Sequence, residues 1–162
     1  MKPLVLAAGL AALIAALPVQ AQNAGQIARV RSSASCPGCN LFQGDFSGLE
    51  ANGLNLSGAR IRQADLSLVV MNRTRFTGAD LRDVEAYGGV FSSSNFARAD
   101  LTNSSWVGAY LDGSSFAGAT LTGANLSGAR LARATGLTQR QLNGACGDAS
   151  TVLPRGLSIP AC

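Results

Sequence analysis

The chain has 162 residues, a formal net charge of +4 and no histidine. Without histidine, it lacks the usual general base of enzymes and their commonest metal ligand, and it contains no glycine-rich phosphate loop or Gly-x-Ser-x-Gly motif. Acidic and basic residues balance between 41 and 136, so no basic stripe is available to bind nucleic acid. We therefore expect a protein that is not an enzyme, holds no cofactor or metal and does not bind nucleic acid.

Residues 1–21 have the pattern of a secretory signal peptide. Lys2 supplies the positive start, residues 4–17 are an apolar run, and residues 19–21 fit a cleavage site. We expect cleavage between Ala21 and Gln22, which places the mature protein in the periplasm or outside the cell, with no membrane span after signal cleavage. The alternative is an uncleaved anchor, but the apolar run is shorter than the about 20 residues of a membrane helix.

Residues 22–40 are expected to form an N-terminal leader and cap. Residues 22–35 contain no dense apolar pattern, so we expect a flexible leader there. A turn that holds Cys36 and Cys39 then follows and leads into a repeat that begins at residue 41.

A repeat with a period of five residues runs from 41 to 136. Every fifth residue from Leu41 to Leu131 carries a large apolar side chain, apart from Ala51 and Ala86, and the register continues without an insertion. The residue two positions earlier is mostly small, and the other three positions are mainly polar. The clearest stretch is Ala119-Thr120-Leu121-Thr122-Gly123, followed by Ala124-Asn125-Leu126-Ser127-Gly128.

A period of five fits neither the helix period of about 3.6 nor the strand period of about two. It requires a chain that turns a corner every five residues, with the large residue inward and the small residue inward nearer the corner. Four units then close one square coil, and successive coils stack about 4.8 Å apart. The sequence predicts an all-β solenoid of about five coils.

Two units show a family resemblance. Residues 79–83 (Ala-Asp-Leu-Arg-Asp) and 99–103 (Ala-Asp-Leu-Thr-Asn) resemble the A(D/N)LXX consensus of the pentapeptide-repeat family. The resemblance implies a right-handed quadrilateral β-helix, in which the departures at Ala51 and Ala86 suggest a locally thin core. Some members of the family bind DNA gyrase with an acidic rod that mimics duplex DNA, but the neutral repeats and predicted export of this chain fit that role poorly.

Residues 137–162 are expected to close the C-terminal end. Thr138 and Gln141 have the spacing of a capping box, so we expect a short helix over about 139–145. The remaining tail, 147–162, contains two prolines and should be an irregular strap held by Cys162.

The four cysteines are expected to form disulfides, because their number is even and the chain has a signal-peptide pattern. We favour Cys36–Cys39 and Cys146–Cys162, since each pair would lie at one end of the rod. One alternative is a zinc site, which needs all four thiolates within about 2.3 Å of one ion. The other is a redox-active Cys-Pro-Gly-Cys, which usually begins a helix.

Residues twenty apart should stack in rows, and the rows differ in charge. One row is acidic in its N-terminal half, whereas three arginines lie on the preceding side, so we expect charges to segregate by side. The acidic row contains Asp45, Asp65 and Glu85, and the arginines are Arg60, Arg62 and Arg82.

The corner after the acidic row should carry an apolar ridge. The same register turns six apolar or aromatic side chains outward there: Leu68, Val70, Tyr87, Val90, Val107 and Tyr110. Such patches often mark interaction sites on a polar surface. The alternatives are burial under the chain's own tail or a second subunit, and scattered exposure without a role.

These features favour a non-catalytic periplasmic or secreted scaffold that binds through the rod surface. Its partner would be an unknown envelope protein or a second copy of the chain. A carbohydrate or cell-surface binding module is an alternative, using polar ladders and the two tyrosines. A redox protein using Cys36 and Cys39, and a gyrase-binding rod, are the others.

Overall fold

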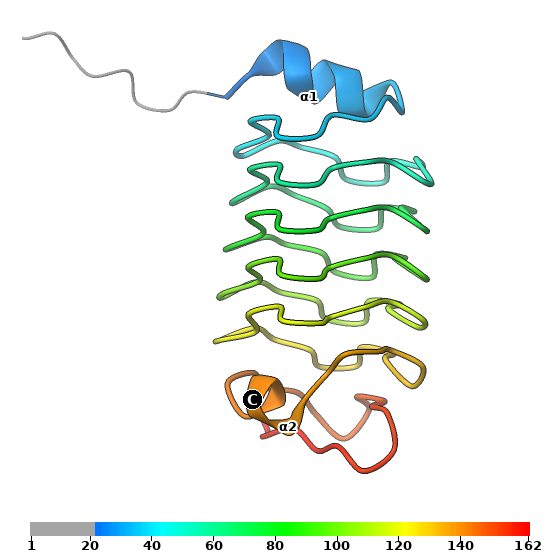
Figure 1. Ribbon diagram of the computed structural model, residues 1–162, viewed down its shortest axis with the longest axis vertical. Helices are drawn as coiled ribbons and strands as arrows, with labels where there is room; N and C mark the ends of the chain where they lie inside the picture. The colour runs from blue at the N-terminus through cyan, green and yellow to red at the C-terminus, as the bar shows by residue number, and fades with distance from the viewer. Residues whose placement is uncertain (1–21) are drawn as a thin grey trace, which may run out of the picture.

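The computed structural model describes residues 22–162, and the predicted signal peptide, residues 1–21, lies outside the described residues. The chain forms helix α1 (Ala24–Arg31), a stack of coils and the short helix α2 (Gln139–Leu142). Figure 1 shows the coils piled along one axis, with α1 at one end and α2 at the other. Among residues 22–162, no helix is both long and apolar enough to cross a membrane.

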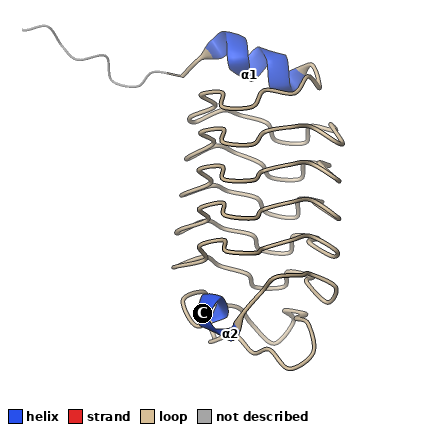
Figure 2. Cartoon of the chain, in the orientation of Figure 1, coloured by secondary structure: helices blue, strands red, loops and turns tan. Residues whose placement is uncertain are grey.

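Each side of a coil pairs with the next coil through parallel bridges between residues twenty apart. One ladder joins Asn40, Arg60, Asp80, Asp100 and Thr120, and three similar ladders follow the other sides. The bridges are single residues separated by turns, so the described part of the chain contains no continuous strand. Figure 2 accordingly draws the described residues outside the helices as loop. The predicted square coil is present, but its sheets are ladders of isolated bridges.

The first coil begins at Cys36, five residues earlier than predicted. The backbone N–H groups of Cys36 and Gly38 donate to the carbonyls of Asn55 and Ser57, each at 2.9 Å. Cys36 is also buried, twenty positions before the buried Leu56. The repeat therefore includes the Cys-Pro-Gly-Cys segment, whose first cysteine takes the place of the large apolar residue.

Two side chains of each unit point inward, and their volumes compensate. The commonest unit combines a central Leu with an earlier Ala. Where the central residue is Phe46 or Phe91, the earlier residue is Gly44 or Gly89, and a Cβ on either glycine would lie 2.5 Å from the ring. Interiors are close-packed, so the earlier position has to shrink where the central one grows.

The reverse compensation occurs at Ala51 and Ala86. The earlier residues of these units are Leu49 and Val84, which are larger than the usual Ala. Val84 is fully buried and Leu49 packs against the core. The thin core expected at these units is therefore filled from the neighbouring inward position.

An aromatic stack forms the centre of the rod. Phe96 stacks between Phe76 and Phe116, with ring centroids 5.0 and 5.1 Å apart and nearly parallel planes. The inward positions beside two of these rings are Ser94 and Ser114, whose buried hydroxyls donate to main-chain carbonyls at 2.9 and 2.7 Å. Serine fits beside the rings because it is small, and its hydroxyl avoids the cost of an unpaired buried group.

Helix α1 caps the N-terminal end, so the expectation of a flexible leader at 22–35 is wrong. Asn23 is its N-cap, with a side chain that accepts from the N–H of Gln26. Val30 is fully buried and Ile27 packs against the core. The end of a narrow rod is small, so two apolar side chains three positions apart cover it without the dense pattern that a longer helix would show.

Helix α2 starts as predicted and ends earlier. Thr138 and Gln141 form the capping box, but the helix ends at Leu142 rather than near 145. Cys146, just before the tail, bridges to Asn125, and the tail itself is not irregular throughout, because Val152 bridges to Arg130. These segments add a partial coil to the last complete one, with one and two residues more than the period of twenty.

The two disulfides are those favoured from the sequence, Cys36–Cys39 and Cys146–Cys162. The first closes a corner of the first coil, and the second ties the chain's last residue to the partial coil. All four cysteines are bonded, so they do not converge on a zinc site.

Candidate functional site

The six side chains of the predicted apolar ridge lie along one corner of the rod. Leu68, Tyr87 and Tyr110 are 61%, 58% and 45% exposed, and they are three of the four exposed large apolar residues in the described part of the chain. Val70, Val90 and Val107 are half-buried between them. Parallel bridges join Val70 to Val90 and Val90 to Tyr110, so these three residues stand in consecutive coils.

The C-terminal tail does not cover this ridge. It continues the stack instead, through the bridge between Arg130 and Val152. Val152 is the fourth exposed large apolar residue and extends the same row by one level. Sequence reasoning missed it because the tail departs from the five-residue period, and no local signal restores the register.

Leu68 is the unusual member of the ridge. Its φ is 57°, in the left-handed region, and the residues at the same corner of the other coils are Gly48, Gly88, Gly108 and Gly128. A left-handed backbone costs about 1–2 kcal/mol for a residue with a Cβ, and exposure of a leucine to water adds no compensation. Leu68 therefore places an exposed apolar side chain at a position where glycine would adopt the backbone conformation at lower cost in free energy.

Opposite charges lie on either side of the run Val70, Val90 and Tyr110 in the ridge. Glu50 lies one coil before Val70, and Arg130 lies one coil after Tyr110, in the same ladder. The Arg130 guanidinium lies over the Tyr110 ring, 5.6 Å from its centroid, in a cation–π contact. Both charged residues are exposed, and within residues 22–162 neither forms an ion pair.

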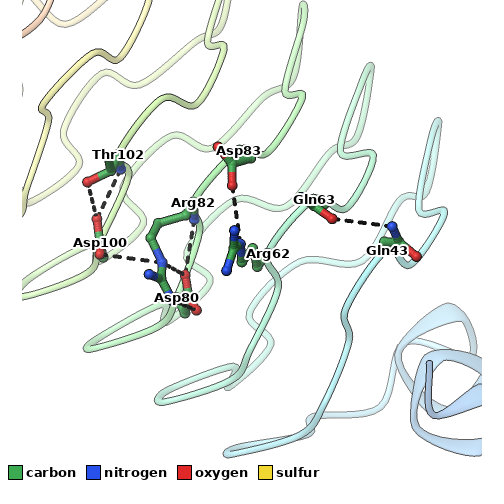
Figure 3. Close-up of polar contacts among 8 residues, drawn as sticks. All are labelled: Gln43, Arg62, Gln63, Asp80, Arg82, Asp83, Asp100 and Thr102. Atoms are coloured by element: carbon green, nitrogen blue, oxygen red, sulfur yellow. Dashed lines mark hydrogen bonds and ion pairs between the residues drawn. The ribbon is translucent and has the colours of Figure 1, made fainter. Parts of the chain in front are cut away.

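A second side of the rod, here called the charged side, carries charged side chains that pair with one another, as Figure 3 shows. Arg62 donates to Asp83 of the next coil at 3.2 Å. Arg82 donates to both carboxylate oxygens of Asp80 at 2.7 Å, and it also lies 3.7 Å from Asp100. The expected acidic row is present, because parallel bridges join Asp45 to Asp65 and Asp65 to Glu85. The expectation that the arginines occupy a side of their own is wrong, because arginines and aspartates share this side.

These contacts also stabilise the ionised carboxylate of Asp80. The hydrogen bonds from the Arg82 side chain hold the pKa of Asp80 below its ordinary value, against a smaller opposing effect of burial. Further along this side, Gln43 donates to Gln63 at 3.2 Å, and the Thr102 hydroxyl donates to Asp100 at 2.5 Å. A side whose polar groups already pair with one another offers little to a partner.

A hollow of about 370 Å³ lies beside α1, lined by residues of that helix and by Gln43 and Asp45. Arg31 donates there to the carbonyl of Asp45. Within residues 22–162, no group of three or more carboxylate or thiol side chains is arranged to hold a metal ion.

The coils and their inward pattern define a solenoid of five-residue repeats. A protein-family model described as Pentapeptide repeats matches the chain in eight copies, over residues 52–85 and 94–132. The chain is therefore a member of the pentapeptide-repeat family, which implies that the β-helix is right-handed.

Several solved pentapeptide-repeat structures are similar to the chain. HetL, involved in heterocyst differentiation regulation in the cyanobacterium Nostoc, is 24% identical with a TM-score of 0.40; the match covers 74% of this chain and 64%, less than two thirds, of HetL. QnrB1, a plasmid-mediated fluoroquinolone resistance protein, is 18% identical with a TM-score of 0.46 and 78% of each chain covered. A protein of the Arabidopsis thaliana thylakoid lumen is 16% identical with a TM-score of 0.30, over 72% of this chain and 81% of that one. None of the curated proteins compared with the chain matches it.

Proposed function

We propose that the chain is an exported, non-catalytic binding protein that contacts another protein through its apolar ridge. The observation that carries the proposal is Leu68, which is 61% exposed and left-handed at a corner where the other coils have glycine. An exposed apolar side chain that hinders folding is best explained by a role in binding. Tyr87 and Tyr110 extend the same surface, and tyrosine is enriched at protein interfaces.

The compartment is the periplasm or the outside of the cell. Two disulfides are typical of an oxidising environment, and the pattern of residues 1–21 is that of a signal peptide. The absence of histidine from the whole sequence supports a role without catalysis. The charged side supports the choice of the ridge, because its Arg62 and Arg82 are already paired with aspartates.

The variant Tyr87→Ser/Tyr110→Ser tests this proposal. Affinity capture from the cell envelope, together with measurement of the oligomeric state, should show that it loses binding while its unfolding curve stays close to that of the wild type. Phe42→Ser is the matched control, because Phe42 is also an outward-facing aromatic residue with an arginine, Arg60, 5.1 Å over its ring. Unchanged capture and oligomeric state in the double variant would contradict the proposal. Retention of the wild type on polysaccharide columns, lost in the same variant, would point to a carbohydrate ligand instead.

A further inference from the structure

We propose that the apolar ridge binds a second copy of this chain, in an antiparallel dimer whose two-fold axis passes through Val90. This inference rests on the proposed function, because it names the partner of the same ridge. The inference is argued from the ladder of bridges at the centre of the ridge, here called the ridge ladder. Its residues are Glu50, Val70, Val90, Tyr110 and Arg130.

The ridge ladder is complementary to itself when two copies run in opposite directions. Glu50 stands two coils before Val90, and Arg130 stands two coils after it. Since coils are evenly spaced at about 4.8 Å, a two-fold axis through Val90 places Glu50 of each copy opposite Arg130 of the other. Val70 and Tyr110, one coil to either side of the axis, face one another in the same way. A two-fold axis makes each contact occur twice, as in isologous interfaces.

Other arrangements lose this complementarity. In a parallel dimer with the coils level, Glu50 would face Glu50 and Arg130 would face Arg130, and like charges across an interface are unfavourable. In an antiparallel dimer shifted by one coil, Glu50 would face Tyr110 or Val152, neither of which carries a charge. The charges at the ends of the ridge ladder therefore select both the direction and the register.

The corner beside the ridge ladder fits the same arrangement. Leu68 lies one coil before the axis, and Gly108 lies one coil after it at the same corner. The exposed Leu68 side chain of each copy thus faces a glycine of the other, where no side chain competes for the space. Tyr87 lies in the same coil as Val90 and meets its own counterpart near the axis.

The charges that the dimer uses are free to pair. Glu50 and Arg130 are exposed, and no ion pair engages either within the described residues. The cation–π contact of Arg130 with Tyr110 holds its guanidinium over the ridge rather than away from it. By contrast, Arg62 and Arg82 on the charged side already have aspartate partners.

The contact is accessible but small. In the view of Figure 1, α1 and the C-terminal tail lie above and below the coils rather than beside them. One side of the ladder is about 20 Å tall from five coils and at most about 16 Å wide from five residues. This is less than the about 800 Å² per partner of a standard interface, so we expect a dissociation constant in the micromolar range.

Charge reversal tests the pairing. In the purified, disulfide-bonded protein, Glu50→Arg and Arg130→Glu each set like charges opposite one another twice per dimer. Each should weaken self-association by about tenfold or more, measured by sedimentation equilibrium at micromolar concentrations. An equimolar mixture of the two variants should restore association, because each supplies the charge that the other lacks. Arg75→Glu is the matched control: Arg75 has the same position in its unit on another side, between Asn55 and Asn95 of the adjacent coils.

Cross-linking tests the direction. Val90→Cys should give a disulfide-linked dimer under mild oxidation, because the axis brings the two copies of this position together. Glu50→Cys alone should not link, whereas a mixture of Glu50→Cys and Arg130→Cys should. A parallel pair would instead link each variant with itself and would overturn the proposed geometry.

The outcomes separate this inference from the proposed function. A wild type that stays monomeric at high micromolar concentration, or reversals that leave association unchanged, would overturn the dimer. If the monomeric wild type still captures an envelope protein and Tyr87→Ser/Tyr110→Ser does not, the ridge binds proteins but its partner is not a second copy. If that double variant retains both capture and association, the ridge is not a binding surface at all.

Discussion

The side chain of Leu68 lies against Gly88, the residue at the same corner one coil later, because a Cβ on Gly88 would stand only 3.0 Å from Cδ2 of Leu68. The glycine leaves room for a leucine that remains 61% exposed. Leu68 therefore gains little burial in exchange for its left-handed φ of 57°.

We predict that Leu68→Asn leaves the free energy of unfolding unchanged or raises it by up to about 1 kcal/mol. Asparagine tolerates a left-handed backbone better than leucine, and Asn103 has a φ of 56° at the equivalent position of another side. Urea unfolding followed by the fluorescence of the buried Trp106 measures the change. A loss of stability well above 1 kcal/mol would assign Leu68 to folding rather than to binding.

Gly89→Ala should destabilise the rod by about 1–3 kcal/mol, because the new Cβ would overpack the Phe91 ring. Combining it with Phe91→Leu should cost less than the sum of the two single changes, since an Ala two positions before a Leu is the commonest combination among the units. A double-mutant cycle from denaturant unfolding tests this coupling. Strict additivity would contradict the volume compensation between the two inward positions.

The Arg82–Asp80 pair should contribute to stability in a pH-dependent way. Asp80→Asn should lower the free energy of unfolding by up to about 1 kcal/mol at neutral pH, the range of exposed ion pairs. Because Arg82 lowers the pKa of Asp80, the contribution is complete above the ordinary aspartate value of about 3.9 and is lost as the pH falls through the lowered value. Unfolding of wild type and variant from neutral pH to strongly acid pH should therefore converge. Glu85→Gln, which removes an exposed carboxylate without an ion pair in the described chain, is the control.

The two disulfides should differ in how much they contribute to the free energy of unfolding. Cys146→Ser/Cys162→Ser opens a loop with a sequence separation of 16 and should cost about 3 kcal/mol in the chain-entropy model. Hydrogen exchange should then show faster exchange at Val152 and Cys162, whose N–H groups donate to the carbonyls of Ala129 and Gly147. Cys36→Ser/Cys39→Ser opens a much shorter loop and should cost less. Equal losses for the two pairs would show that local packing, rather than loop closure, sets their contribution.

The coils could be predicted from the sequence because one period determines them. Once the large residues recur every five positions, the four sides, the inward positions and the rows twenty apart all follow. The caps do not repeat, so the period says nothing about them. Ile27 and Val30 are too few to be recognised as a helix pattern, and Cys36 hides the first unit because it stands where a larger apolar residue is expected.

The sequence predicted the ridge better than it predicted the charged side. Register places a residue in a row, which is enough to bring Val70, Val90 and Tyr110 together. It does not say which way a long side chain turns, so the pairing of Arg62 with Asp83 could not be read from the rows. Val152 lies in the ridge row although it is 22 residues after Arg130 rather than 20. A fixed period of twenty therefore does not place it there.

Because both ends of the rod are capped, the number of coils is fixed. Distances between surface groups along the rod are therefore fixed as well. The distance between Glu50 and Arg130 is a whole number of coils, each about 4.8 Å, and it does not depend on flexible side chains. Inserting one twenty-residue coil between them would lengthen the rod by one step without changing the chemistry of any side. Two rods of unequal length could align one end of their ridges but not both, so coil number alone would distinguish one partner from another.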